Sequence, residues 1–377
     1  MAEKILVGMS GGVDSSVTAW LLQQQGYDVE GLFMFNWAED ESGYCDAADD
    51  YQNALSVCEE LGIPLHRADF STEYRERVFQ SFLDGYAAGH TPNPDVLCNR
   101  EIKFKSFLEY ALRLGADKIA TGHYAGVREV NDRAQLVMAK DHNKDQTYFL
   151  ALVTEQALRH VLFPLAAFTK PEVRAMANEA GLPNHARKDS TGICFIGERP
   201  MREFLGGYLE AAPGPIYSLD HAGRQIGEHQ GLLFHTLGQR RGLGLGGMQD
   251  ASDAPWFVVH KNMADNSLWV SQQSDHPQLM SSSAELNESH WIGDAPALPL
   301  RCKARIRHRQ ALQDCTVHSL DGTSTGLTVD FDQPQRAVAA GQYIVFYRDD
   351  LCLGGGSVTF SHTLEPHLQD DAKETSA

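Results

Sequence analysis

The chain has 377 residues, 42% of them hydrophobic, and a formal net charge of -18 at pH 7. A chain of this length is expected to hold two or three domains. The acidic charge excludes a protein that attracts nucleic acid through its overall field, so a nucleic-acid site needs a local cluster of basic residues. No apolar window of about eighteen residues and no basic-then-apolar leader occurs, which predicts a cytoplasmic protein without a membrane span.

Seven cysteines at irregular spacing include no Cys-x-x-Cys pair, so we expect free thiols and no structural metal. A lone cysteine is most often a small buried apolar residue. That interpretation suits five of the seven: Cys45, Cys58, Cys302, Cys315 and Cys352.

Residues 4–16, KILVGMSGGVDSS, predict a buried strand, a tight turn and the start of a helix. Backbone N–H groups and the positive end of the helix dipole meet at such a turn, which suits phosphate. The lysine of a P-loop and the third spaced glycine of a dinucleotide site are both missing. The run SGGVDSS instead resembles the pyrophosphate loop of the ATP pyrophosphatase (PP-loop) superfamily, which activates a carbonyl as its adenylate.

Asp14 lies inside this predicted phosphate site. A carboxylate there is costly unless a cation lies between it and the phosphates, so we expect Mg²⁺ to accompany ATP. The same aspartate counts against the alternative, a serine-rich helix cap that binds no ligand.

Apolar runs then alternate with helical patterns. We expect strands at 28–35, 65–70 and 117–122, and helices at 46–61, 72–88 and 100–114. This alternation predicts an α/β domain with a parallel sheet covered by helices on both faces. Ligands of such sheets lie beyond the carboxyl ends of the strands, so Ser10, Met34 and Gly122 are expected to line one pocket.

Two turn-rich segments each contain a cysteine. Residues 89–99 are predicted to form a loop that is stiffened by two prolines and includes Cys98. Residues 186–195 form the second, with Cys194, after a helix that opens with the capping pattern Thr-Lys-Pro-Glu at 169–172.

The composition changes at Ala-Pro-Gly-Pro, residues 212–215, which we interpret as a linker. Strand-like runs at 267–271, 300–309, 326–331, 342–347 and 351–358 predict a small β-barrel. The predicted organisation is a catalytic ATP-binding domain at 1–211, a central β-rich domain at 212–266, a C-terminal β-barrel at 267–363 and an acidic, disordered tail at 364–377.

Residues 300–309 contain a local cluster of basic residues of the kind that a nucleic-acid site in an acidic protein needs. Every odd position from Arg301 to Arg309 is arginine or lysine, and the even positions are mostly apolar. Since a strand alternates its faces, five cations are expected on one side of the sheet. We favour an RNA-facing surface, because five like charges repel one another without a polyanion. The alternative is a solvated strand matched by nearby acids.

The sequence contains three motifs: Asn-Pro-Asp ahead of Cys98, Gly-Ile-Cys194-Phe-Ile-Gly, and Gly-Gln-Arg-Arg-Gly-Leu-Gly at 238–244. At these three motifs it resembles the bacterial tRNA 2-thiouridylases (tRNA-uridine 2-sulfurtransferases). The resemblance covers the chain except for the acidic tail. It implies that the C2 oxygen of the wobble uridine is replaced by sulfur in the tRNAs for lysine, glutamate and glutamine. The C2 carbonyl is first adenylated, and a cysteine persulfide then supplies sulfur, giving 2-thiouridine, AMP and pyrophosphate.

The resemblance assigns the persulfide to Cys194 and makes Cys98 the nucleophile that attacks it, leaving a Cys98–Cys194 disulfide. The sulfur is implied to come from a cysteine desulfurase, directly or through relay proteins. Both thiols need nearby cations to react as thiolates, and we expect these from their sequence neighbours Arg100, Arg187 and Lys188.

The family's binding positions carry over in three groups. The ATP site comprises Gly8, Met9, Ser10, Gly11, Gly12, Val13, Asp14, Ser15, Met34 and Gly122. The target base, which must leave its stack to be reached, is contacted by Asn93, Pro94 and Asp95. The tRNA is contacted by His123, Lys144, Asp145, Gln146, Arg307, His308 and Gln342. His308 occupies an even position of the basic strand, so it can reach RNA only from the strand's end.

Two rival functions stay open. Another PP-loop enzyme, of the lysidine synthetase or amidotransferase type, adenylates a carbonyl but needs no pair of loop cysteines. A non-catalytic ATP-binding RNA module has the loop but releases no pyrophosphate.

Overall fold

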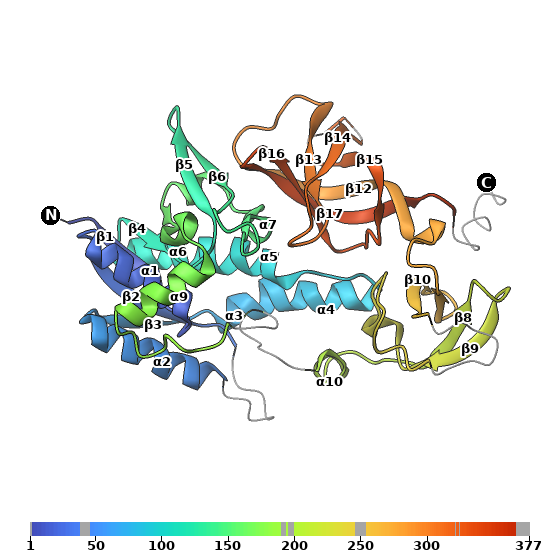
Figure 1. Cartoon of the computed structure of the whole chain (residues 1–377), viewed down its shortest axis with the longest axis horizontal. Coiled ribbons are helices and arrows are strands. Elements are labelled where there is room, and N and C mark those ends of the chain that lie inside the picture. The colour runs from blue at the N-terminus through green and yellow to red at the C-terminus, as the bar shows by residue number, and fades with distance from the viewer. Residues whose placement is uncertain are drawn as a thin grey trace.

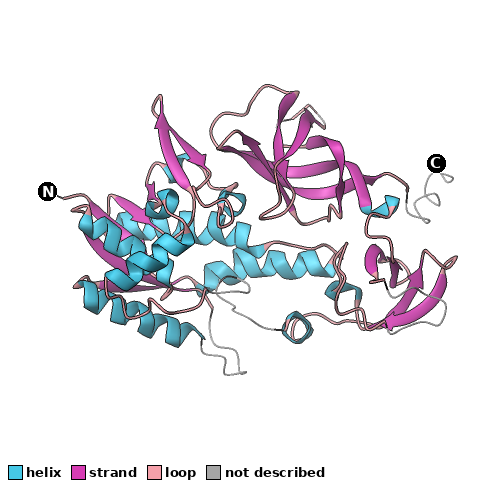
Figure 2. Cartoon of the chain, viewed as in Figure 1, coloured by secondary structure: helices cyan, strands magenta, loops and turns pink. Residues whose placement is uncertain are grey.

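The computed structural model describes residues 2–37, 46–189, 194, 200–245, 254–320, 322–323 and 325–366. The chain forms an N-terminal α/β domain, a small central sheet and a C-terminal barrel, which lie side by side in Figure 1. Figure 2 shows the helices gathered around the first sheet, whereas the C-terminal half is built almost entirely of strands. Within these residues, no helix is both long and apolar enough to cross a membrane.

The first sheet is parallel, with strand order β3-β2-β1-β4-β7. Its strands are β1 (Lys4–Gly8), β2 (Asp28–Phe35), β3 (Leu65–Asp69), β4 (Lys118–Ala120) and β7 (Val161–Leu162). In the central strand β1, Leu6 enters one hydrophobic core while Ile5 and Val7 enter another on the opposite face. Burial on both faces requires helices on both sides, which confirms the predicted α/β architecture.

The helices of this domain include α1 (Val13–Gln24), α2 (Asp46–Leu61), α7 (Thr147–Leu150), α8 (Glu155–Leu158), the 3-10 turn η3 (Pro164–Ala167) and α9 (Lys170–Glu179). Among them, α1, α2 and α9 were predicted, whereas α7, α8 and η3 were not. The predicted capping box is present at α9, where Thr169 and Glu172 exchange hydrogen bonds. After this domain, α10 (Met201–Gly206) leads towards the central sheet.

Two longer helical segments each contain a π-helical stretch. The first joins α3 (Ser71–Tyr74), η1 (Arg75–Phe79) and α4 (Gln80–Ala87), and the second joins α5 (Pro94–Cys98), η2 (Asn99–Ser106) and α6 (Phe107–Arg113). The prediction of a loop up to residue 99 was therefore wrong. Pro94 takes the first helical position, where its missing N–H costs nothing, and starts a helix that ends at Cys98.

The central sheet has the order β10-β11-β8-β9. Its strands are β8 (Gly214–Ser218), β9 (Arg224–His229), β10 (Phe257–Asn262) and β11 (Ser267–Ser271), with the 3-10 turn η4 (Leu232–Phe234) between β9 and β10. The assignment of 267–271 to the barrel was wrong, because β11 pairs with β10 and β8. Leu268 and Val270 on β11 pack with Ile216 on β8 in one core, and this shared core holds the strand in the central sheet.

Six strands close into the predicted barrel, with β12 paired to both β15 and β17. They are β12 (Met280–Trp291), β13 (Leu300–Arg305), β14 (Gln313–Ser319), β15 (Leu327–Arg336), β16 (Tyr343–Arg348) and β17 (Leu351–Thr363), preceded by the 3-10 turn η5 (Pro277–Leu279). A hairpin of the first domain, β5 (Gly126–Val130) and β6 (Arg133–Val137), joins β17 through Val137 and Leu351. This pairing ties the N-terminal α/β domain to the barrel.

The basic strand differs from expectation. Its apolar positions turn inward as predicted, but β13 ends at Arg305, and Arg307 and Arg309 lie beyond it. Arg301 forms an ion pair with Asp332 on β15, and Lys303 forms one with Asp314 on β14, with 3.0 Å between the charged atoms. The prediction of five unmatched cations was therefore wrong, because neighbouring strands supply acids.

Of the five cysteines predicted to be buried, Cys58, Cys302, Cys315 and Cys352 are buried. Cys45 lies outside the described residues, as do the acidic tail from residue 367 and the segments 190–193 and 195–199 around Cys194.

Candidate functional site

The PP-loop runs from the end of β1 into α1. Gly11 has a φ of +74°, in the left-handed region that favours glycine. Gly12 is the N-cap of α1, and its carbonyl accepts hydrogen bonds from the hydroxyls of Ser15 (3.0 Å) and Ser16 (2.9 Å). The loop thus exposes the positive end of a twelve-residue helix beside small side chains, an arrangement that fits phosphate.

The end of β4 lies directly against this loop. A Cβ atom on Gly122 would lie 2.8 Å from the Asp14 carbonyl carbon and 2.8 Å from the Ser15 nitrogen. A Cβ atom on Gly8 would lie 3.4 Å from the Met34 Cε. The carboxyl ends of β1, β2 and β4 therefore come together, as expected for the ATP site.

Asp14 already has a cationic partner. Its two carboxylate oxygens accept hydrogen bonds from the Lys170 ammonium at 2.7 and 2.8 Å, and Oδ1 also accepts one from the Tyr124 hydroxyl at 3.0 Å. Burial and the charge of Asp14 raise the pKa of Tyr124, so this hydroxyl stays protonated as a donor. The cation at Asp14 is thus Lys170, the first residue of α9, which sequence reasoning missed.

The same lysine links the PP-loop to the segment that leads to Cys194. Its Nζ lies 2.9 Å from Asp189, which also pairs with Lys144 and Arg174, both at 2.6 Å. Partial burial opposes ionisation, but the hydrogen bonds from Lys144 and Lys170 hold the pKa of Asp189 well below its usual range. Asp189, five residues before Cys194, is therefore linked to Asp14 of the PP-loop through Lys170.

Cys98 and Cys194 lie together. Their thiols are in hydrogen-bond contact, with Cys98 fully buried and Cys194 partly exposed. The backbone of Cys194 is fixed on two sides: its N–H donates to Asp95 Oδ1 (3.1 Å), and its carbonyl accepts from the Tyr74 hydroxyl (2.9 Å). The two cysteines, 96 positions apart in sequence, are thus brought into contact by helices α3 and α5.

The two thiols have opposite protonation tendencies. Burial, and the proximity of Cys194, raise the pKa of Cys98. The hydrogen bond from Cys98 and the positive charge of Lys103 lower the pKa of Cys194 despite its burial. The Lys103 Nζ lies 3.4 Å from the Cys194 Sγ. Of the two thiols, Cys194 therefore loses its proton more readily and Cys98 less readily.

The predicted cations for these thiols were wrong. Arg100 is paired with Glu101 at 2.8 Å, and Arg187 is bound to Asp50 and to the Gly11 carbonyl. Lys188 is exposed. The cation in contact with the thiol is Lys103, five positions after Cys98.

Asn93, Pro94 and Asp95 form the start of α5, with Asn93 at its N-cap. The Asp95 carboxylate accepts a hydrogen bond from the Cys194 N–H, so its contact in this structure is with Cys194. The residues just before this motif meet both other domains: the Thr91 N–H donates to Ala340 in the barrel (2.8 Å), and its hydroxyl lies 3.4 Å from that of Thr236 in the central domain. The proposed base-contact motif is thus next to a three-domain junction.

Three of the seven predicted tRNA residues connect the first domain to the barrel. Asp145 is buried and pairs with Arg305 (2.7 Å), and its carbonyl lies 3.0 Å from His308 Nε2. The Gln342 amide donates to the Thr91 carbonyl (2.7 Å).

The other predicted tRNA residues lie as follows. His123 is buried against Phe104 and Phe163, Lys144 pairs with Asp189, Gln146 accepts from the Tyr124 N–H (2.9 Å), and Arg307 donates to the Ala337 carbonyl (2.7 Å). All seven thus have partners within the protein, and their role towards tRNA stays a prediction.

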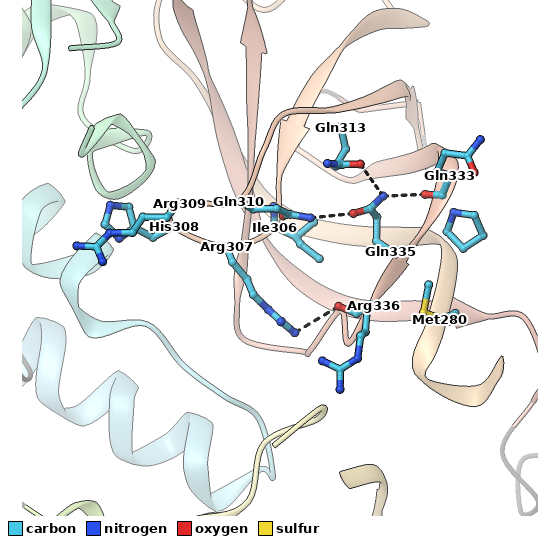
Figure 3. Close-up of a pocket in the computed structure, with 11 residues that line it drawn as sticks. Met280, Ile306, Arg307, His308, Arg309, Gln310, Gln313, Gln333, Gln335 and Arg336 are labelled. Carbon is cyan, nitrogen blue, oxygen red and sulfur yellow. Dashed lines mark hydrogen bonds between the residues drawn. The ribbon is translucent and has the colours of Figure 1, made fainter. Parts of the chain in front are cut away.

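A pocket of about 510 Å³ opens on the barrel surface where β13 ends (Figure 3). Three arginines line it, Arg307, Arg309 and Arg336, together with amide side chains. Gln335 is held by Gln310 (2.9 Å) and Gln313 (3.2 Å). Three basic side chains are therefore gathered beyond the end of the strand and not along it.

In the described part of the chain, no group of three histidine, cysteine or acidic side chains is placed to hold a metal ion.

Three family models match the chain. They are described as a tRNA methyl transferase HUP domain (residues 3–198), a tRNA methyl transferase PRC-barrel domain (202–272) and an aminomethyltransferase beta-barrel domain (281–358). The second model includes β11, in agreement with the sheet topology.

Curated relatives match nearly the whole chain. The tRNA-specific 2-thiouridylase MnmA of Serratia proteamaculans (strain 568) is 54% identical over 359 residues, which cover 94% of this chain and 97% of that protein. The enzyme of the same name from Escherichia coli O1:K1 / APEC is 52% identical over 360 residues, which cover 95% and 97%. The chain therefore belongs to the tRNA-specific 2-thiouridylase family.

Proposed function

We propose that the protein is an ATP-dependent tRNA-uridine 2-sulfurtransferase. The observation that carries this proposal is the contact between two thiols of opposite protonation tendency, Cys98 and Cys194, in a domain with a PP-loop. Relatives that are 52–54% identical over nearly the whole chain are named tRNA-specific 2-thiouridylases. A carbonyl-activating loop and a sulfur-carrying thiolate are the two devices that this reaction needs.

ATP is needed because the uracil C2 carbonyl is a weak electrophile whose oxygen cannot leave. In our proposal the PP-loop, with residues 8–15, Met34 and Gly122, binds ATP, and the C2 oxygen attacks the α-phosphate and releases pyrophosphate. Asp14 would hold Mg²⁺ against the phosphates once these draw Lys170 away from it. The bound Mg²⁺ would neutralise phosphate charge during adenylation.

Sulfur transfer follows on the thiol side. The Cys194 thiolate attacks the terminal sulfur of a donor persulfide, and the donor leaves as a thiolate. The terminal sulfur on Cys194 then forms a bond to the activated C2 carbon, and AMP leaves with the former oxygen. Cys98, after losing its proton, attacks the Cys194 sulfur, so that the S–S bond to the new thio group breaks and a Cys98–Cys194 disulfide remains. A reductant restores both thiols.

We further propose that the substrates are the wobble uridines of the tRNAs for lysine, glutamate and glutamine, and that the sulfur donor is a cysteine desulfurase or a relay protein. The motif 93–95 would receive the flipped base, because it begins the helix that ends at Cys98. The barrel pocket with Arg307, Arg309 and Arg336 would contact tRNA phosphates. A tRNA-modifying enzyme acts where tRNA is present, so we expect a cytoplasmic location.

The test is mass spectrometry of unmodified tRNA incubated with the protein, ATP, Mg²⁺ and a persulfide donor. One oxygen-to-sulfur exchange on a uridine is expected, and it is expected to disappear when ATP is omitted or Cys194→Ser replaces the native protein. Full pyrophosphate release by Cys194→Ser, with no sulfur added to the tRNA by either protein, would instead favour a PP-loop enzyme that uses an amine. Absence of pyrophosphate release would favour a non-catalytic RNA module.

A further inference from the structure

Lys103 is a charged residue near the thiols that the proposed mechanism does not yet use. It belongs to η2, and its ammonium lies 3.4 Å from the Cys194 Sγ. Its positive charge lowers the pKa of two neighbours, Cys194 and the buried His123. The charge of Lys103 therefore acts on the thiol pair and on His123, the residue after Gly122, which lies against the PP-loop.

The π-helical stretch explains how this lysine reaches the thiols. In an α-helix, a residue five positions further on lies about 140° around the axis, which would place Lys103 far from Cys98. The π-helix closes its hydrogen bonds between residues i and i+5, so it has more residues in each turn and brings such a residue back towards the same face. The π segment begins directly after Cys98, and Lys103 lies within it.

The charges around the pair show what the ammonium does. Cys194 is faced by Cys98 and Asp95 from α5, by Tyr74 from α3 and by Lys103 from η2. Burial works against a charged lysine, but the attraction of Cys194, Cys98 and Asp95 raises the pKa of Lys103. Tyr74 stays neutral because burial and the surrounding negative groups raise its pKa. Lys103 is thus the cation facing this thiol among the described residues.

We propose that Lys103 is a further catalytic residue, whose ammonium holds Cys194 as a thiolate and then holds the negatively charged terminal sulfur of its persulfide. This inference rests on the proposed function. The step it assists is the attack of the Cys194 thiolate on a donor protein persulfide: one S–S bond forms, one breaks, and the donor departs as a thiolate. No net oxidation occurs, and Lys103 keeps its proton throughout.

The test measures the thiolate directly. The full-length protein is alkylated with iodoacetamide over a range of pH, and the labelling rate at Cys194 is followed by peptide mass spectrometry. In the wild type, the midpoint is expected below the value of about 8.5 of an ordinary cysteine. Lys103→Met is expected to raise the midpoint by at least about one pH unit, a tenfold loss of thiolate at neutral pH. Lys103→Arg is expected to retain the low midpoint.

Lys105→Met is the matched control. Lys105 lies two positions further on, is exposed, and pairs with Glu101 at 2.9 Å, so its loss is expected to leave the midpoint unchanged. An unchanged midpoint in a folded Lys103→Met protein would overturn the proposal. A wild-type midpoint at or above that of an ordinary thiol would overturn it even if Lys103→Met fails to fold.

The labelling needs no ATP, tRNA or sulfur donor. A shifted midpoint in Lys103→Met together with a wild-type protein that adds no sulfur to tRNA would contradict the proposed function and leave the thiolate contact standing. A wild-type protein that adds sulfur together with an unshifted midpoint would contradict the role of Lys103 alone.

Discussion

Gly122→Ala is the substitution that tests the contact between β4 and the PP-loop. The added Cβ would lie 2.8 Å from two backbone atoms, Asp14 C and Ser15 N, whereas ordinary contacts begin at 3.4 Å, so the backbone must move by about 0.6 Å (3.4 − 2.8). Overpacking of this kind costs about 1–3 kcal/mol of folding free energy. Because a displacement of about 1 Å in a reacting group can cost about 100-fold in rate, we expect ATP–pyrophosphate exchange to fall at least about tenfold.

The assay measures tRNA-dependent ATP–pyrophosphate exchange and urea unfolding on the same preparations. Gly206→Ala is the control: Gly206 ends α10, its Cβ position is empty within 4 Å, and alanine favours a helix, so exchange and stability are expected to be at least those of the wild type. Wild-type exchange and stability in Gly122→Ala would refute the close packing of β4 against the loop.

Three further predictions concern the barrel and α9. Arg305→Ala leaves the buried Asp145 carboxylate unpaired and is expected to lower the free energy of unfolding by about 3–5 kcal/mol. Arg301→Ala on the same strand removes an exposed ion pair and is expected to cost about 0–1 kcal/mol. Urea unfolding measures both losses, and equal losses would contradict the argument that burial makes the Arg305 pair stronger. Arg309→Ala is expected to weaken tRNA binding and to reduce the slope of log K against log salt by about 1. Lys303→Ala removes a charge that Asp314 already matches, so it is expected to change the slope less. The same slope for both variants would contradict a contact between the pocket and tRNA. The hydrogen bonds of Glu172 with Thr169 and Lys140 lower its pKa from 4.5 to about 2, so this carboxylate stabilises the fold above pH 4.5 and the stabilisation is lost as the pH falls towards 2. Glu172→Gln is expected to remove that part of the pH dependence of the thermal unfolding midpoint. The same pH profile in the variant and the wild type would contradict the capping box.

Local patterns predicted the first domain well. The bounds of β2 and α2 agree with the sequence prediction, because a continuous apolar run and a helical period ending at glycine are complete within their own segments. The PP-loop was also readable, since its small residues and Asp14 are adjacent in sequence. Its partner Lys170 was not, because the ion pair joins residues 156 positions apart.

The failures have a common physical cause. The charges of Arg301 and Lys303 are neutralised by Asp332 and Asp314, which belong to other strands and reach the basic strand only through the barrel pairing. The position of β11 is likewise decided by which hydrophobic core accepts its side chains.

Lys103 illustrates the same limit within one helix. In an α-helix, a residue five positions after Cys98 would not lie on the same face, so the spacing of Lys103 did not mark it as a neighbour of the thiols. The local sequence gives no indication of a π-helical stretch. The nearer arginines therefore looked like better candidates, although Arg100 and Arg187 are bound elsewhere.

The central claim is that the contacting thiols of Cys98 and Cys194 carry out sulfur transfer. The most direct measurement is peptide mass spectrometry of the protein after one turnover with tRNA and ATP, starting from sulfur-loaded Cys194 and without reductant. A Cys98–Cys194 disulfide is expected to form in the same amount as 2-thiouridine. Formation of 2-thiouridine while both cysteines remain free thiols would contradict the account.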